Sequence, residues 1–295
     1  MTQTHDLPPI GIIGGSGLYA PGMLDEARAV TVETPWGAPS DRITLGRMAG
    51  RQMAFLPRHG RGHPLPPDAV PYQANIAALK MLRCREVLAI SAVGSLRPDF
   101  RPGDFVQVDQ YIDRTTRRAP SFFGPGLVAH VSLADPTCPD LSAAATAAAR
   151  AAGATVHPAG TYLAMEGPQF STRAESRMYR AWGADVIGMT GMPEARLARE
   201  AELCYASLAM VTDYDSWHEA EAAVDVTAIL RVLTANATLA QATVAALPAQ
   251  PATCGAGCGR ALDHALMTAP SARDPKMVER LMPIAGRLLT QPPTE

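Results

Sequence analysis

Short apolar runs alternate with amphipathic stretches along most of this 295-residue chain. An apolar run bounded by Gly, Pro, Asp or Ser is typical of a buried strand. Five runs fit that description: PIGIIGG from Pro9, EVLAISAVGSL from Glu86, GDFVQVDQYI from Gly103, AGTYLAM from Ala159 and CYASLAMVTDYD from Cys204. Strands separated by helices predict the α/β class.

Helical spacing of apolar residues fills the intervals between and after these strands. The predicted helices are VPYQANIAALKMLR, LSAAATAAARAAG, RAESRMYRAWG, MPEARLAREAEL, DVTAILRVLTANATLAQATVAAL and DPKMVERLMPIAGRLL. Gly153 and Gly183 are placed to end the second and third of them. No linker or internal repeat divides the chain, so we predict one domain over residues 1–295, with a helical extension from about residue 248.

Residues 115–126, TTRRAPSFFGPG, have no periodicity and are rich in Pro, Gly and Arg. Segments of this kind usually run over the surface, and some of them close over ligands. We therefore predict a mobile surface loop that is suited to act as a lid.

Charge excludes several classes of partner. The chain has 26 basic and 28 acidic residues, a net charge of −2, and no run of like charges, so neither nucleic acid nor a membrane surface is an expected partner.

The N-terminal MTQTHDLPPIG lacks the pattern of a secretory signal, and no apolar run approaches the roughly 18 residues of a membrane span. A cytoplasmic protein that binds small molecules is expected.

The glycine-rich GIIGGSGLYA permits a dinucleotide-binding hypothesis. Gly15, Gly17 and Ala20 satisfy G-x-G-x-x-A after a strand, and Glu33 lies far enough downstream to bind a ribose. The fingerprint needs a helix at this loop, yet Pro21 and Gly22 follow within one turn. A tight turn, or an anion-binding loop of backbone N–H groups and the Ser16 hydroxyl, remains open.

Several loops that follow apolar runs carry groups able to bind an anion. PRHGRGH, residues 57–63, crowds two arginines and two histidines into one glycine-rich turn, although a solvated basic loop explains it equally well. ISAVGSL and VIGMTGMPEA end strands in small or hydroxyl residues, where α/β sheets bind ligands. Together these loops predict a phosphate site formed by Ser16, Arg58, His59, Ser91 and Thr190.

Two carboxylates, Asp213 and Asp215, stand at the end of the apolar run CYASLAMV. Adjacent like charges and burial both raise the pKa of a carboxyl group, so one member of the pair can hold a proton near neutral pH. A carboxyl group that holds a proton near neutral pH can act as a general acid in catalysis. The competing interpretation is a turn or helix cap at the strand end.

The motifs GIIGGSGLY, PRHGRGH, SAVGSL, YLAMEGPQFSTRAESRMYRAWGADVIGMTGMPEARLARE and CYASLAMVTDYDSW, in this order, resemble the methylthioadenosine phosphorylase branch of the trimeric purine nucleoside phosphorylases. The resemblance covers about Ile10 to Leu247. It implies a single α/β domain whose mixed sheet curls into a distorted barrel flanked by helices, a homotrimer, and phosphorolysis of a purine nucleoside without cofactor or metal, inorganic phosphate being the co-substrate.

The resemblance also implies roles for single residues. Ser16, Arg58, His59, Ser91, Thr190 and the Ala92 backbone resemble phosphate ligands, and serine stands where the family commonly has threonine at two of these positions. Met189 resembles the residue beneath the ribose and Phe170 the stacking partner of the purine. His130 resembles a residue that reaches into a neighbouring subunit's site, and Leu281 is a further candidate for that role.

Because a proton delivered to a leaving purine lowers the barrier to glycosidic cleavage, we assign that role to Asp213. Base and sugar preferences follow from the same resemblance. Ionised Asp213 and Asp215 accept hydrogen bonds from the 6-amino group of adenine, although a protonated aspartate can also donate to a 6-oxopurine. Val226, Ile229 and Leu233 share one face of a predicted helix and suit a 5′-methylthio group, unless that face only packs in the core. We expect 5′-methylthioadenosine as substrate, with 6-oxopurine nucleosides or 5′-methylthioinosine as the alternative.

Five cysteines, at positions 84, 138, 204, 254 and 258, include no CxxC pair. An odd number in a reducing compartment predicts free thiols. Cys254 and Cys258 bracket a Gly-Ala-Gly turn, where a disulfide or a shared metal is conceivable, but two ligands do not make a zinc site. No metal is predicted.

Overall fold

The computed structural model describes residues 7–15, 18, 23–218, 226–251 and 253–290, without the side chains of residues 226–230. Its strands are β1 (Ile10–Gly14), β2 (Asp25–Val30), β3 (Ile43–Met48), β4 (Arg51–Pro57), β5 (Glu86–Ser95), β6 (Phe105–Val108), β7 (Gln110–Asp113), β8 (Val156–His157), β9 (Thr161–Ala164), β10 (Val186–Gly188) and β11 (Cys204–Asp213). Its α-helices are α1 (Tyr72–Met81), α2 (Pro139–Ala151), α3 (Arg173–Ala181), α4 (Glu194–Glu200), α5 (Val226–Ala245) and α6 (Pro275–Leu289).

All of these strands join one mixed sheet in a single α/β domain, as predicted. The main path runs β2-β3-β4-β1-β5-β10-β9-β7, and β5 also pairs with β11, which leads to β6 and β8. Strands β1, β4, β5 and β11 run parallel to their neighbours in this group, whereas β10 is antiparallel to β5. The pairings among the described residues branch at β5 and leave the sheet open, so they form no closed barrel.

Alternating side chains of the central strands build two cores, one on each face of the sheet. Odd-numbered residues of β5 and β11 enter the core that contains Val87, Ala89, Tyr205 and Ala209, and even-numbered ones enter the core that contains Leu88, Ile90, Ala206 and Leu208. Burial on both faces explains why these strands are almost continuously apolar in the sequence.

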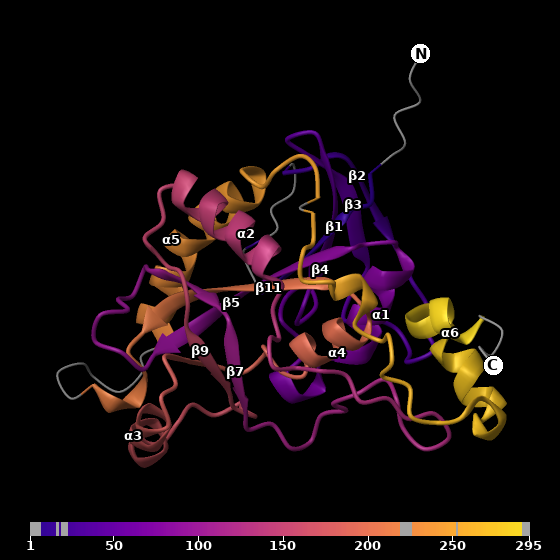
Figure 1. Ribbon diagram of the computed structural model, residues 1–295. Helices are drawn as coiled ribbons and strands as arrows, with labels where there is room; N and C mark the ends of the chain where they lie inside the picture. The colour runs from indigo at the N-terminus through magenta and orange to yellow at the C-terminus, as the bar shows by residue number, and fades with distance from the viewer. Residues whose placement is uncertain (1–6, 16–17, 19–22, 219–225, 252, 291–295) are drawn as a thin grey trace.

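Helices cover both faces. Buried residues of α1, α4 and α6 belong to the first core, and those of α2 and α5 belong to the second. Figure 1 shows α2 and α5 together on one side of the sheet, with α1, α4 and α6 on the other. The carboxyl ends of β1, β4, β5 and β11 lie at one edge between these layers.

Strand predictions were incomplete. The run GDFVQVDQYI forms two strands, because β6 pairs with β11 whereas β7 pairs with β9. The antiparallel ribbon β2-β3-β4 and the two-residue strand β8 were missed. Strand β2, DEARAV, is exposed and charged and has no apolar signal, whereas β3 and β4 are mostly buried.

The segment 115–126 is anchored, which corrects the prediction of a mobile lid. Arg118 is buried, and its Nε donates to Glu166 Oε1 at 2.9 Å. Phe122 and Phe123 enter the core, and the Phe122 N–H donates to Glu200 Oε2 at 2.7 Å. The sequence signal of Pro, Gly and Arg marked an irregular segment, but its aromatic and guanidinium groups fix it to the body of the protein.

The last helix also departs from one expectation. Leu281 has no exposed surface and packs in the first core beside Ile284, so it does not reach toward another subunit. Within the described part of the chain, no helix combines the length and hydropathy that a membrane span requires.

Candidate active site

A cavity of about 340 Å³ lies at the sheet edge where the central strands end. Its walls come from the loops after β1, β4, β9 and β10, from the second half of β5 and the end of β11, and from α5. Nine of the predicted site residues line it: Arg58, His59, Ser91, Ala92, Phe170, Met189, Thr190, Asp213 and Asp215. Segments separated by more than 150 residues therefore converge on one hollow, as expected for strand ends in an α/β sheet.

Four predicted residues are not among the lining residues. Ser16 lies outside the described residues, although its neighbour Gly15 lines the cavity. The side chains of Val226 and Ile229 are also outside the description, but Leu233, further along α5, lines the cavity. His130 is exposed on the surface, and its backbone N–H donates to the Ala265 carbonyl at 2.9 Å.

Arg58 follows β4 and is held rigidly by Glu194 of α4. Its Nε and Nη2 donate to the two carboxylate oxygens of Glu194 at 2.8 and 3.0 Å, and Nη1 donates to the Ile90 carbonyl at 3.2 Å. Burial opposes the charge of the Arg58 guanidinium, but the Glu194 carboxylate raises its pKa. These bonds use three of the five N–H donors of Arg58, which leaves donors to bind an anion in the cavity.

Glu194 was not predicted as a site residue. It is fully buried and also accepts a hydrogen bond from the Tyr205 hydroxyl at 3.0 Å. Its position in the first turn of α4, after the motif GMP, was visible in the sequence. A buried acid needs a partner, but the sequence does not say that the partner is an arginine 136 residues away.

His59 is buried, and its side chain is uncharged near neutral pH. Its Nδ1 lies 2.9 Å from the Leu65 carbonyl oxygen, so Nδ1 carries the proton and Nε2 is an acceptor. Its ring stacks on His63 with centroids 4.1 Å apart. Burial and the neighbouring Arg58 charge lower the pKa of His59 to about 4. In this state Nε2 of His59 can only accept a hydrogen bond.

The lowered pKa of His59 predicts a pH-dependent stability. Above pH 6.5, its ordinary pKa, neither the folded nor the unfolded chain protonates this side chain. Between pH 6.5 and about 4 only the unfolded chain binds the proton, so the free energy of unfolding falls as the pH falls. Urea unfolding in phosphate-free buffer should show this loss in the wild type and less of it in His59→Gln.

The control for this experiment is His264→Asn, which removes an exposed histidine. It should keep the wild-type slope of stability against pH. A wild-type slope in His59→Gln would show that His59 is not the group responsible.

Asp213 ends β11, Asp215 begins the 3-10 turn Asp215–Trp217, and both residues line the cavity. Asp213 Oδ1 accepts the Asp215 N–H at 2.8 Å, and Asp213 Oδ2 accepts the Thr212 hydroxyl at 2.7 Å. The backbone approach needs Gly94, where a Cβ would lie 3.0 Å from Asp213 Oδ1 and 3.2 Å from Asp215 Cβ.

Burial raises the pKa of Asp215, and the neighbouring Asp213 carboxylate adds to that effect. Among the described residues, the buried Oδ2 of Asp215 has no hydrogen-bond partner. The N–H of an incoming amino group would satisfy this oxygen, whereas a protonated Oδ2 would itself need an acceptor. The raised pKa that the sequence predicted for one member of the pair is therefore found at Asp215, while Asp213 remains our predicted proton donor.

Arg118 joins the two loops that carry Met189 and Phe170, and no local pattern in the sequence identified it as a site residue. Its Nη1 donates to the Met189 and Met192 carbonyls, each at 2.6 Å, and its Nη2 donates to the Glu166 carbonyl at 2.8 Å. Burial opposes ionisation of Glu166, but N–H donors of the 115–126 segment lower its pKa to about 2. Arg118 thus fixes two cavity walls, a positioning role that only the tertiary structure reveals.

The dinucleotide hypothesis gains no support. That motif requires a helix after β1 and a return to a parallel strand, yet strand β2 begins at Asp25 and pairs antiparallel with β3. Glu33 is exposed and is not among the residues that line the cavity.

Comparisons with known sequences and structures all identify the same family. Residues 9–248 match the family model of the phosphorylase superfamily. The chain is 61% identical to the S-methyl-5′-thioadenosine phosphorylase of Cereibacter sphaeroides, over 95% of this chain and 98% of that protein. A crystal structure of methylthioadenosine phosphorylase from an antarctic soil metagenomic library superposes with a TM-score of 0.87 at 46% identity, covering 95% of this chain and 99% of that one.

A mutant of the adenosine/methylthioadenosine phosphorylase of Schistosoma mansoni, in complex with methylthioadenosine, also superposes on this chain. The TM-score is 0.76 at 37% identity, and the match covers 81% of this chain and 89% of that one. The family match over most of the chain and the high identities are decisive together: this chain belongs to the phosphorylase superfamily.

Proposed function

We propose that the protein cleaves 5′-methylthioadenosine with inorganic phosphate, releasing adenine and 5-methylthio-α-D-ribose 1-phosphate for methionine and purine salvage. The observation that carries the proposal is the cavity itself, which has Arg58 and Thr190 among its lining residues together with the Asp213–Asp215 pair. Phosphate and purine sites must share one hollow if phosphate is to attack the sugar. The chain's identity of 61% to a protein named for this activity supports the same substrate.

In the proposed reaction, a phosphate oxygen bonds to the anomeric carbon while the bond from that carbon to the purine nitrogen breaks. The electrons of that bond enter the purine ring, and its N7 takes a proton from Asp213. Phosphate held by Ser16, Arg58, His59, Ser91, Thr190 and the Ala92 N–H supplies both the nucleophile and a negative charge near the developing oxocarbenium ion. No cofactor enters this scheme.

Preference for adenine rests on the carboxylate pair. Asp215 Oδ2, which has no hydrogen-bond partner among the described residues, is suited to accept the 6-amino group, while Asp213 is assigned to proton delivery. Phe170, half exposed beside the cavity, offers a ring face for stacking. A 6-oxopurine would bring an acceptor to an acceptor unless Asp215 is protonated.

Preference for the methylthio group rests on α5. Leu233 and Ala237 line the cavity, and Val226 and Ile229 precede Leu233 by seven and four residues on the same helix. Helical spacing assigns all of them to one face. An apolar face beside the sugar's 5′ carbon would accept a methylthio group and leave a hydroxyl unpaired.

We further propose a cytoplasmic homotrimer in which His130 contributes to a neighbouring subunit's site. Val128 and Met267 are exposed apolar residues near His130, and the Met267 N–H donates to the Val128 carbonyl at 2.9 Å. Exposed apolar groups of this kind are typical of contact surfaces between subunits.

The decisive measurement is purine release from 5′-methylthioadenosine and 5′-methylthioinosine, in parallel, with and without phosphate. Adenine released only with phosphate, together with a methylthioribose phosphate, is the expected result. Hypoxanthine as the preferred product would keep the reaction but overturn our interpretation of Asp213 and Asp215. No release from either nucleoside, with a melting temperature raised by a nicotinamide dinucleotide and not by phosphate, would favour the binding-module hypothesis.

A further inference from the structure

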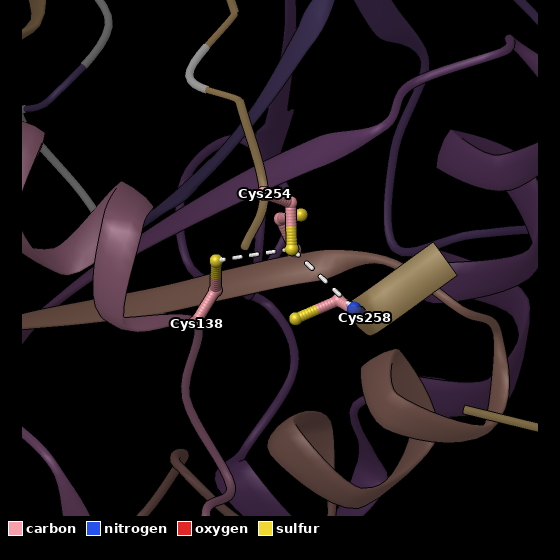
Figure 2. Close-up of side chains that lie close together, drawn as sticks. Cys138, Cys254 and Cys258 are labelled. Atoms are coloured by element: carbon pink, nitrogen blue, oxygen red, sulfur yellow. Dashed lines mark hydrogen bonds between the residues drawn. The ribbon is translucent and has the colours of Figure 1, made fainter. Parts of the chain in front are cut away.

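Four of the five cysteines meet in one cluster outside the cavity. Cys138 precedes α2, Cys204 begins β11, and Cys254 and Cys258 lie in the turns before α6. All four sulfur atoms lie within 4.8 Å of one another. Figure 2 shows the sulfurs of Cys138, Cys254 and Cys258 facing a common space. The two cysteines of the Gly-Ala-Gly turn thus gain two more ligands from distant parts of the chain.

The spacing of these sulfurs suits a tetrahedral metal. With zinc–sulfur bonds of about 2.3 Å, neighbouring sulfurs of a tetrahedron are about 3.8 Å apart. The Sγ atoms of Cys138 and Cys254 are 3.9 Å apart. A disulfide would require these atoms to approach to about 2.05 Å. All five cysteines of the chain carry free thiols in this arrangement.

Backbone contacts fix the ligands in place before any ion binds. The Cys138 N–H donates to the Tyr205 carbonyl at 2.7 Å, which ties the start of α2 to β11. The Gly255 N–H donates to Asp140 Oδ2 at 2.8 Å, which ties the Cys254–Cys258 turn to α2. The C-x3-C spacing of that turn falls in the range used by structural zinc sites.

Donors to sulfur surround the cluster. The Cys258 N–H points at Cys254 Sγ at 3.4 Å, and Arg199 Nη1 donates to Cys258 Sγ at 3.5 Å. Four thiolates with Zn²⁺ carry two excess negative charges, so a guanidinium beside them is favourable. Cys138 and Cys258 are buried against the apolar side chains of the second core, which exclude water from the sulfurs.

We propose that Cys138, Cys204, Cys254 and Cys258 bind one Zn²⁺ as a closed tetrathiolate site. Soft thiolate ligands in a tetrahedral arrangement select zinc over magnesium or calcium. Four protein ligands leave no open position, so the ion is structural and takes no part in phosphorolysis. Cys254 and Cys258 lie beyond residue 248, where the match to the phosphorylase superfamily ends. The bound ion therefore links the segment after residue 248 to α2 and β11, which lie within the part of the chain that matches the family.

The test is metal analysis of the full-length protein, produced in zinc-supplemented cells and purified with a reductant and without chelators. We expect about one zinc ion per chain. After zinc is displaced with a mercurial and the thiols are recovered, Co²⁺ should bind and give the intense visible absorption of a tetrahedral thiolate complex. Intact mass should show all five thiols reduced once the metal is removed.

Variants locate the ion. Cys254→Ser and Cys258→Ser should each lower the zinc content at least about tenfold after dialysis, whereas Cys84→Ala, at the buried cysteine outside the cluster, should retain it. If a ligand variant fails to fold, the wild-type metal content and the Co²⁺ spectrum still decide.

Four results would overturn the proposal. The first is reduced wild-type protein that holds no zinc and takes up no Co²⁺. The second is a mass two hydrogens lower for each bridge, which would identify disulfides within the cluster. The third is iron in place of zinc. The fourth is zinc retained undiminished in Cys254→Ser and Cys258→Ser.

Discussion

Replacing Asp213 with asparagine should slow adenine release from 5′-methylthioadenosine about 10²–10⁴-fold, the usual contribution of a general acid. Asparagine has nearly the same shape but cannot deliver a proton to the purine. Both oxygens of Asp213 accept hydrogen bonds, one from the Thr212 hydroxyl and one from the Asp215 N–H. The asparagine side chain would place its N–H₂ group, which is itself a donor, against one of these two donors. Release assays at saturating phosphate measure the loss in kcat and kcat/KM.

Asp215→Asn separates base recognition from proton delivery. The asparagine amide can donate to a 6-oxo group, so discrimination between methylthioadenosine and methylthioinosine should shrink more in this variant than in Asp213→Asn. Asp25→Asn, on the exposed strand β2, is the matched control and should keep wild-type rates. If Asp213→Asn retains the wild-type kcat while Asp215→Asn loses it, the proton donor is Asp215, whose pKa is already raised by burial.

Local patterns were enough to predict the central strands and most helices. The strands β5 and β11 were visible because burial on both faces makes them continuously apolar. Nine predicted residues line one cavity because strand ends converge in an α/β sheet, and that rule needs no knowledge of which strands are neighbours. Strand β2 was missed for the opposite reason, since its side chains are exposed and charged.

Contacts between distant segments carried no local signal. Arg118 was assigned to a mobile loop because nothing in TTRRAPSFFGPG shows that Met189, 71 residues later, supplies a carbonyl for its guanidinium. The cysteine cluster was undercounted in the same way, since Cys138 and Cys254 are 116 residues apart. Residue types were informative in both cases, but their partners are set by the topology of the sheet.

The second large effect is expected at the buried ion pair of Arg58 and Glu194, whose side chains are 2% and 1% exposed. Removing one partner leaves a buried charge without compensation, so Arg58→Met should lower the free energy of unfolding by about 3–5 kcal/mol. The double variant Arg58→Met/Glu194→Gln should recover most of that loss, because no charge remains and glutamine keeps an oxygen for the Tyr205 hydroxyl. Urea unfolding measures both changes.

Phosphate binding distinguishes a structural from a functional role of this pair. Saturating phosphate, at about 100 times its Kd, should stabilise the wild type by about 2.7 kcal/mol, and the double variant should lose most of this gain despite its recovered stability. Arg51 and Glu86 form a second buried pair, at the opposite end of β5, and provide the control. Arg51→Met should lose comparable stability yet keep the full response to phosphate. An undiminished phosphate response in the double variant would exclude Arg58 from the anion site, because the Arg58 guanidinium would have been removed without any effect on phosphate binding.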